Sequence, residues 1–484
     1  MNIKKYLHSR RYYSLVLLAV ICVLMLMLAS CEQKPDDTIS VNALQEKIEI
    51  KTEAYVTDLT DSRSGLTTND KMAKYIVNWA ESKGIRVKTD GDLIIMNVDG
   101  SEAYKNAPKT VIICPYDEAD FDGTMNSLIV AFYVLKNNED TGRLTALFLP
   151  ETAHDLSSAD LLKKKYFGDR TKVICLSGGE HAAVAHTTGG ASRYVFRKNY
   201  DLIKPKNRLA YRITIKGIKN SVIDNSINTK INPIVELNAL LAGLKSSAID
   251  YEIGSMRGGK DGLLYPGRCV LTITVDEDKQ AAFEKKILAR IDSFDKRKKT
   301  ADPEAVYEYE ETRLPGKVIS QQDSSELAGF IYTLLEDEYH QDEDTDMLQA
   351  VCDVSYIRTG GGKIRIGSNA CCIDDERLSE IDEAERTLSG LSGFKYKKTF
   401  SYPAWNNVDE EEPSEFETAF KKAYKKYTGK KLKIDPQVTP SYGSKVAELN
   451  KKTDALAITV SDNSLTDLTG AVMEYLIQSN IKQE

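Results

Sequence analysis

The amino-acid sequence predicts an α/β domain that is interrupted by a large α+β insert. Up to about residue 180, short apolar runs alternate with helical stretches, which is typical of a mostly parallel sheet covered by helices on both faces. Near Arg208 the pattern changes to paired strands with longer helices, and after Trp405 it returns to the first style. The chain is also too long for one compact unit, so at least two domains are expected.

The first thirty residues have the three parts of a secretion signal. Four basic residues lie within the first eleven positions, an apolar run covers Leu15–Leu28, and the small residues Ala29 and Ser30 follow it. This run is shorter than the ~20 residues that a membrane-spanning helix needs. The sequence therefore predicts a signal peptide at 1–30 that is removed from the mature protein.

Cys31 is predicted to carry a lipid. Leu-Ala-Ser-Cys resembles the bacterial lipobox, in which the cysteine sulfur receives a diacylglycerol before cleavage. The polar segment 31–43 contains Pro35 and is expected to be a tether between the lipid and the fold. The predicted location is the bacterial cell envelope, with the membrane as a partner through Cys31, and inner or outer membrane and leaflet stay open.

The elements of the first part can be assigned in order, beginning near Leu44. Met72, Ile76 and Trp79 follow Thr68-Asn69 at helical spacing and predict a helix that ends at Gly84. Strands are expected at 93–98, 110–114, 145–149 and 173–176, and helices at 127–135 and 158–166. Functional groups of such sheets collect beyond the carboxyl ends of the strands, here 115–126, 150–155 and 177–186.

The insert reads as two α+β units of ferredoxin-like type. The first unit is expected to contain a strand at 209–215, a helix at 233–244, strands at 251–255 and 269–275, and a helix at 280–294. The second is expected to contain a helix at 325–336, strands within 354–373, a helix at 375–388 and a strand at 394–401. This assignment places the α/β domain at 44–206 and 406–484 and the insert at 207–405.

The closing part has a helix that begins after Ser414, where Ser414 and Glu417 form a capping-box pair, and that stops at Gly429. A buried strand at 455–460 and a helix at 466–477 complete it. The net charge of −7 and the absence of a long Lys/Arg cluster argue against nucleic acid as a partner. A homodimer is left open.

Four motifs resemble the aminoacyl-histidine dipeptidase branch of the two-zinc metallopeptidases. They are a lid strand and helix start at Lys216–Ile218 and Asn232–Ile234, a Gly-Gly run with its proline at Gly258–Pro266, Tyr402-Pro403-Ala404-Trp405, and a glycine at Gly443. The resemblance spans about Leu44 to Ile477, and its motifs occur in the family's order. The resemblance implies a zinc exopeptidase-like α/β domain with the insert as its lid.

The resemblance also implies two zinc ions in active relatives, with a Glu as general base. The first ligand pattern, H-x-D, falls on Pro115-Tyr116-Asp117, which keeps the Asp but places a proline at the ligand position. The bridging Asp falls on Met125, while the neighbouring Asn126 is kept. Asp117 and Asn126 are both expected to face a cleft between the two domains.

The remaining ligand positions are changed as well. The E-E pair falls on Thr152-Ala153, or on Glu151-Thr152 if the alignment shifts by one residue, and the later Asp falls on Ser177. Around Ser464 there is no histidine, and the last histidine of the chain is His340, in the insert. Asp117 and Glu151 are therefore interpreted as remnants of a catalytic pair, and no metal cofactor is predicted.

A relocated metal site could use His154, Asp155, Glu180, His181 and His186. His181 and His186 are five residues apart, which matches neither helical pairing distance, and glycine pairs flank their segment. We interpret these histidines as loop residues that contact solvent or make hydrogen bonds.

Three functions are weighed. The leading one is an exported lipoprotein with a dipeptidase-like fold, without two-zinc hydrolysis, that binds a peptide or small ligand between its domains. The second is an active metal-dependent dipeptidase with an altered site that uses Asp117, Glu151 and displaced histidines. The third is a structural or interaction module of the cell envelope with a collapsed cleft.

Overall fold

The computed structural model describes residues 37–100, 107–138, 141–219, 221–225, 230–341, 348–406 and 413–478. The predicted signal peptide and Cys31 lie outside the described residues. Helix α2 covers Asp37–Ser62, so the second half of the expected tether at 31–43 is helical. Pro35 precedes this helix, and no glycine or proline interrupts it. In the part of the chain that the structure describes, no helix is both long and apolar enough to cross a membrane.

The α/β domain is built on a sheet with parallel strands at its centre. Among the described residues the strand order is β1-β2-β4-β3-β5-β20-β6. The strands are β1 (Arg86–Asp90), β2 (Leu93–Val98), β3 (Thr110–Tyr116), β4 (Leu144–Pro150), β5 (Lys172–Gly178), β6 (Ala183–Ala185) and β20 (Asp454–Val460). β3 is parallel to β4 and β5, and β20 is parallel to β5, whereas the outer pairs are antiparallel. The mostly parallel sheet predicted from the sequence is confirmed.

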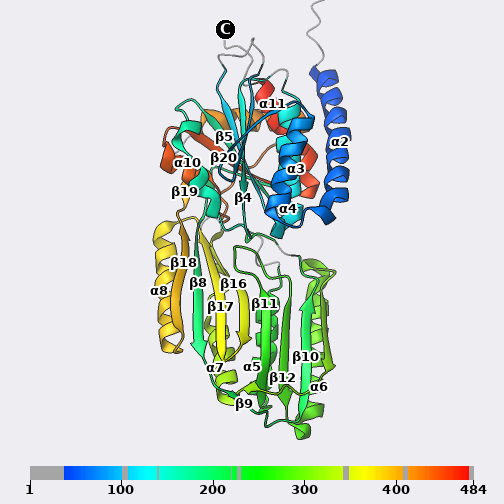
Figure 1. Ribbon diagram of the computed structural model, residues 1–484, viewed down its shortest axis with the longest axis vertical. Coiled ribbons are helices and arrows are strands. Elements are labelled where there is room, and N and C mark those ends of the chain that lie inside the picture. The colour runs from blue at the N-terminus through cyan, green and yellow to red at the C-terminus, as the bar shows by residue number, and fades with distance from the viewer. Residues whose placement is uncertain are drawn as a thin grey trace, which may run out of the picture. The chain divides into compact units, whose positions relative to one another are not determined.

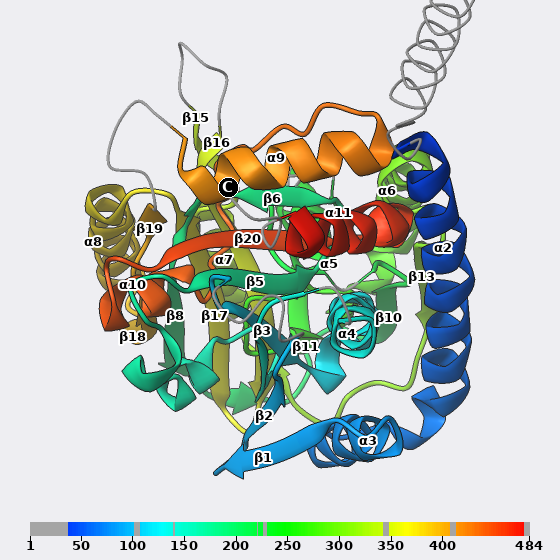
Figure 2. The ribbon, with the colours of Figure 1, turned by 90° about the horizontal axis from the view of Figure 1, so that it is seen from above.

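Helices cover both faces of this sheet (Figures 1 and 2). Helices α3 (Asn69–Ser82), α4 (Phe121–Lys136), α9 (Glu415–Thr428) and α11 (Leu465–Gln478) lie on one side, and α10 (Gly443–Leu449) lies on the other. Strand β4 shows the division, because Phe148 packs against Phe132 of α4, which in turn stacks on Trp79 of α3. Leu147 and Leu149 point the other way and pack with the buried side chains beneath α10.

The helix expected at 158–166 does not form. Two short 3₁₀ turns, Ser157–Leu161 and Lys164–Tyr166, are separated by extended backbone at Leu162 and Lys163. Ala159, Leu162 and Tyr166 are buried against the sheet at a spacing of three and four residues, which imitates a helical face. The apolar residues thus have helical spacing, but they belong to a loop with two 3₁₀ turns that packs against the sheet.

The insert is built on a second sheet. Its order is β13-β10-β12-β11-β16-β17-β8-β18, with β15 beside β16. The strands are β8 (Gly190–Asn199), β10 (Leu209–Lys216), β11 (Tyr251–Gly259), β12 (Cys269–Val275), β13 (Val306–Glu311), β15 (Asp337–Gln341), β16 (Leu348–Gly360), β17 (Lys363–Cys372) and β18 (Lys395–Tyr402). Short two-stranded pairs join β9 (Leu202–Ile203) to β14 (Val318–Ile319) and β7 (Thr187–Thr188) to β19 (Trp405–Asn406).

Each half of this sheet has ferredoxin-like strand order, as predicted. The first unit is β10, β11, β12 and β13, and the second is β8, β16, β17 and β18. The second unit therefore begins with β8, ahead of the whole first unit, and the boundary expected at residue 207 falls too late. Tyr194 and Phe196 of β8 pack in the core of the insert. The sequence interpretation missed this strand.

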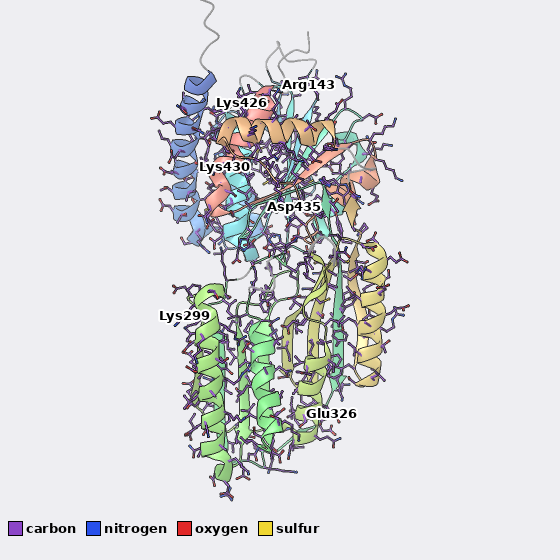
Figure 3. The ribbon with its side chains drawn as sticks, turned by 180° about the vertical axis from the view of Figure 1, so that it is seen from behind. Arg143, Lys299, Glu326, Lys426, Lys430 and Asp435 are labelled. Carbon is purple, nitrogen blue, oxygen red and sulfur yellow. The ribbon has the colours of Figure 1, made fainter. Side chains whose placement is uncertain are left out.

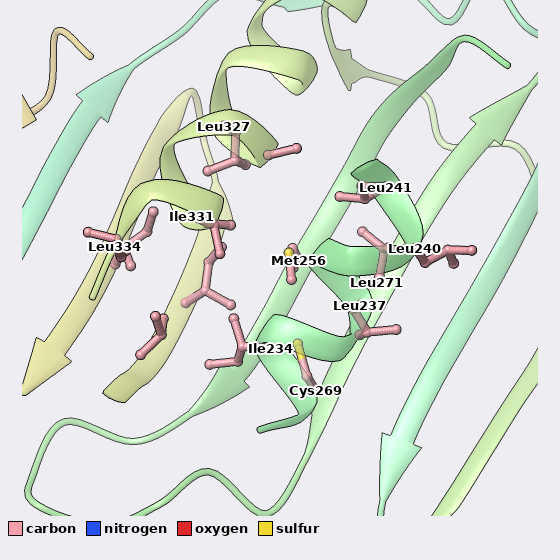
Figure 4. Packing of buried hydrophobic residues seen from close by; sticks show 14 of the residues in the cluster. Ile234, Leu237, Leu240, Leu241, Met256, Cys269, Leu271, Leu327, Ile331 and Leu334 are labelled. Atoms are coloured by element: carbon pink, nitrogen blue, oxygen red, sulfur yellow. The ribbon is translucent and has the colours of Figure 1, made fainter. Parts of the chain in front are cut away.

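Four helices pack on one face of the second sheet (Figure 3). They are α5 (Pro233–Ser246), α6 (Gln280–Ala301), α7 (Gln321–Thr333) and α8 (Asp375–Leu391). Figure 4 shows apolar side chains of α5 and α7 closing over Met256 of β11 and Leu271 of β12. Because side chains alternate along a strand, the residues between these apolar ones point to the opposite face.

The two ferredoxin-like units meet where β11 pairs with β16. Gly258 pairs with Ile357 and Gly259 with Tyr356. A Cβ atom on Gly259 would lie 1.8 Å from the carbonyl oxygen of Ser355, and the φ of Gly259 is +65°. The Gly-Gly of the family-like motif thus permits close approach of two strands.

Candidate functional site

A cavity of about 290 Å³ lies beyond the carboxyl ends of the parallel strands. This is the edge of the sheet at which ligand sites of α/β folds form. Both the α/β domain and the insert line it. The α/β domain contributes Pro115, Glu151, Ser177 and Thr459, and the insert contributes Val222 and Leu263. The cavity is therefore closed on one side by the insert.

Three of the positions at which the resemblance implies zinc ligands hold Pro115, Met125 and Ser177. Pro115 offers no donor atom, and the Ser177 hydroxyl is hydrogen-bonded to that of Thr459 at 3.1 Å. The Met125 sulfur contacts the Thr60 hydroxyl. Within the described residues, no group of three or more His, Cys, Asp or Glu is arranged to hold a metal. Proline, methionine and serine are not among the residues that usually bind zinc in proteins.

Asp117 is buried and bound to backbone amides. One carboxylate oxygen accepts the N–H of Ala119 at 2.8 Å, and the other accepts the N–H of His154 at 2.9 Å. Asp117 is missing from the described residues that line the cavity. The Asn126 side chain donates to Asp462 at 2.8 Å. The expectation that Asp117 and Asn126 both face the cleft is thus wrong for Asp117, whose carboxylate points into a turn.

Glu151 does line the cavity, but its carboxyl group is held by its neighbours. Oε2 accepts the backbone N–H of Leu156 at 2.8 Å, and Oε1 accepts the Ser158 hydroxyl at 3.0 Å. The Ser158 hydroxyl also lies 2.7 Å from the hydroxyl of Tyr442. Burial, reinforced by the charge of Asp155, raises the pKa of Glu151 to about 8. Glu151 is therefore mostly protonated at neutral pH.

His154 and Asp120 form an ion pair at the rim of the cavity, with Nε2 and Oδ2 2.8 Å apart. Burial alone would lower the pKa of His154, but the hydrogen bond and negative charge of Asp120 outweigh it and raise the pKa to about 9. Burial opposes the charge of Asp120 as well, and the bond to His154 nevertheless lowers its pKa. Both partners are charged at neutral pH.

The turn between Glu151 and Leu156 carries unusual backbone strain. Ala153, His154 and Leu156 all have φ between 52° and 54°, the left-handed region that non-glycine residues rarely adopt. The contacts of Asp117 and Glu151 described above hold two of these residues by their N–H groups. The carbonyl of Ala153 accepts the N–H of Leu263 from the insert at 2.8 Å. The two candidate catalytic residues thus position this turn.

The five residues weighed as a relocated metal site are not gathered. Glu180 pairs with Lys230 at 2.9 Å, and His186 lies 3.4 Å from Glu417. His154 is occupied by Asp120. His181 is exposed and lines the cavity. The interpretation of His181 and His186 as loop residues agrees with the structure, because both lie at bends outside the strands and His181 is exposed.

A solved aminoacylhistidine dipeptidase from Vibrio alginolyticus matches 84% of this chain and 92% of its own, at a TM-score of 0.56 and 15% identity. The chain has the fold of that dipeptidase. The di-peptidase Dug1p from Saccharomyces cerevisiae is also similar, with a TM-score of 0.48 and 13% identity over 92% of this chain and 99% of its own. Human carnosine dipeptidase 1 has a TM-score of 0.47 and 9% identity over 91% of this chain and 98% of its own.

No protein-family model matches the sequence, and no curated protein does. The resemblance read from the sequence motifs is confirmed at the level of the dipeptidase fold. The cores of the motifs have structural roles in that fold: Asn232 caps α5 and donates to the carbonyl of Val354, and Trp405 packs flat on Gly443.

Sequence reasoning missed two features of the site in this dipeptidase fold. The pairing of Asp120 with His154 joins residues 34 apart on two loops, and the only local signal was the helical N-terminus after Asp120. Tyr442, which contacts Ser158, comes from the closing part of the chain. Both depend on strand order, which short-range patterns do not encode.

Proposed function

We propose that this protein is an exported, lipid-anchored member of the dipeptidase fold that binds a peptide or small ligand without two-zinc hydrolysis. One observation carries the proposal. A cavity is kept at the ligand-binding edge of the sheet, while the acidic side chains near it are engaged with backbone N–H groups and a histidine. A retained cavity favours ligand binding over a purely structural module.

The chemistry of the cavity suits a small amphipathic molecule. Leu176, Val222 and Leu263 supply apolar wall, and the hydroxyl groups of Ser441 and Thr459 supply polar contacts. A volume of about 290 Å³ is at the small end of ligand pockets. A dipeptide, with charged ends and short side chains, has this size and polarity.

The absence of two-zinc hydrolysis is tested with the purified full-length chain. Elemental analysis after zinc loading is expected to find less than one tightly held zinc per chain, and aminoacyl-histidine dipeptides are expected to stay intact. Two zinc ions per chain together with chelator-sensitive cleavage would establish an active dipeptidase.

Ligand binding is tested by thermal shift against a dipeptide panel. Ala182 lies at the exposed edge of the cavity, so Ala182→Trp should fill the opening without disturbing the core, and Ala182→Ser is its matched control. A dipeptide that stabilises the wild type and the Ser variant, but not the Trp variant, supports the proposal. If no dipeptide shifts the melting temperature of any form, the receptor function is refuted.

The lipid anchor rests on the Leu-Ala-Ser-Cys motif. Cys31→Ser is expected to leave an unlipidated, uncleaved precursor in a bacterial host, because serine cannot form the thioether. Detergent-phase partitioning and mass measurement follow the product. A normally processed Ser variant that still enters the detergent phase would refute lipidation at Cys31.

A further inference from the structure

Five cationic residues stand side by side across the second sheet. Register pairs Lys395 with Arg197, Arg197 with Arg365, Arg365 with Arg358, and Arg358 with Arg257. These residues come from five adjacent strands, β18, β8, β17, β16 and β11. We call them the cationic row. With neighbouring strands about 4.8 Å apart, the row extends over about 19 Å.

The row points away from the helices. Each member lies next to a buried apolar residue of the insert core, as Arg197 follows Phe196 and Arg358 follows Ile357, and all five are exposed. By contrast, Lys198 lies on the helix side, where it pairs with Glu326 of α7, which is labelled in Figure 3.

Few acidic side chains neutralise the row. Among the described residues, the one ion pair made by its members joins Arg365 to Asp261 at 3.2 Å. Arg358 donates to the carbonyl oxygens of Gly258, Gly259 and Ile357, which are uncharged acceptors.

Such an arrangement opposes folding. Like charges directly opposite each other on neighbouring strands are destabilising, and the row contains four such pairs in succession. Burial lowers the pKa of Arg358, and the charge of Arg257 lowers it further. Exposed positions tolerate substitution by uncharged residues, so a row of cations that opposes folding is expected to have a use. Its charge indicates an anion as the partner.

The row lies in a groove with a volume of about 970 Å³. Lys363 and Asn199 extend its basic and polar lining on one side of the row. The described lining contains no aromatic residue, whereas grooves for single-stranded nucleic acid stack bases on aromatic side chains. Cations that line a hollow cannot all approach a flat membrane surface at once.

We propose that this groove binds a linear acidic polysaccharide whose carboxylates face the cationic row. Four of the five cations are arginines, and guanidinium groups pair with carboxylates through two parallel hydrogen bonds. A polyuronate carries one carboxylate per sugar ring, a repeat comparable to the distance between strands. The site is separate from the cavity, and it draws on the proposed export only for access to such polymers.

The test compares two double variants of the full-length chain in neutral detergent. Arg197→Gln with Arg257→Gln removes two charges from the row. Arg212→Gln with Lys216→Gln removes two charges from β10, where these residues are exposed but paired with Glu310 and Glu308. The second variant therefore controls for net charge and for substitution on an exposed strand.

Polygalacturonate is the probe, and affinity electrophoresis and calorimetry measure its binding, with neutral dextran as a blank. We expect the wild type and the β10 variant to bind within twofold of each other, and the row variant to bind at least tenfold more weakly. Raising the ionic strength from about 0.01 to about 0.15 M shortens the screening length from about 30 to about 8 Å and should weaken binding strongly.

Equal loss of binding in both double variants would mean a non-specific charge effect and would overturn the proposal, as would the absence of polygalacturonate binding by the wild type. Tighter binding of an oligo-dT strand or of phosphatidylglycerol vesicles than of polygalacturonate would also overturn it. Binding to dipeptides in the thermal-shift assay is unaffected by these outcomes, so the two sites fail or succeed separately.

Discussion

Glu151→Gln is expected to remove most of the decrease in the free energy of unfolding that deprotonation of Glu151 causes as the pH rises. In the folded protein the pKa of Glu151 is about 8, against an ordinary value of 4.5. A raised pKa means that the folded state binds the proton more tightly than the unfolded state. Its contribution is complete below pH 4.5 and is lost as the pH rises through 8.

The magnitude follows from the shift. At about 1.36 kcal/mol per unit, Glu151 alone should lower the free energy of unfolding by about 4 kcal/mol between pH 4.5 and pH 8. Glutamine has the shape of the protonated acid: its oxygen can accept the N–H of Leu156, and its amide can donate to the Ser158 hydroxyl. Glu151→Gln should therefore match the wild type near pH 5 and exceed it by several kcal/mol at pH 8.

Urea unfolding at four values between pH 5 and pH 8 measures this difference. The pKa of His154 is raised to about 9, so the protein also loses the contribution of His154 to stability between pH 6.5 and pH 9. Because this loss occurs in both proteins, the difference between variant and wild type at each pH isolates the effect of Glu151. Glu118→Gln, at an exposed position nearby, is the control and should follow the wild-type curve. Parallel curves for Glu151→Gln and wild type would refute a buried, protonated Glu151.

Three further substitutions test the packing described above. Asp117→Ala leaves two partly buried N–H groups without an acceptor and should cost about 1–3 kcal/mol in urea unfolding. The half-exposed Asp122→Ala should cost under about 1 kcal/mol, and equal effects would contradict the positioning role. Gly262→Ala would place a Cβ 2.3 Å from that of Ala153 and should destabilise by about 1–3 kcal/mol, and a neutral result would mean that the two loops do not touch. Arg257→Gln should raise stability by about 0.2–1 kcal/mol at low salt by removing a like-charge pair, and a loss of stability would mean that the row is neutralised within the chain.

Local sequence signals were sufficient for most elements. Thr68 caps α3 through the N–H of Lys71, and Gly429 ends α9 in the left-handed conformation, because both signals act within one turn of helix. The apolar strands at the centre of the α/β sheet were also recognisable, since strands buried on both faces leave continuous apolar runs.

Features that join distant parts of the chain were not predictable in this way. Strand β8 lay outside the expected insert because its partners, β17 and β18, come more than 150 residues later. Asp117 was expected to face the cleft, but its carboxylate is captured by the N–H of His154, in a turn whose left-handed residues give no sequence signal. The cationic row leaves no cluster in the sequence, because strand register alone brings its arginines together.

The position of β20 has a consequence for how the protein is made. This strand lies between β5 and β6, although the whole insert and two further helices, α9 and α10, separate it from them in the sequence. Until residue 460 has been synthesised, β5 has an unpaired edge and β6 has no neighbour in the sheet. Non-local pairing of this kind delays folding. Under the proposed export, such a late-arriving strand would help to keep the chain unfolded until it has crossed the membrane. A version truncated before β20 should remain protease-sensitive throughout its α/β domain.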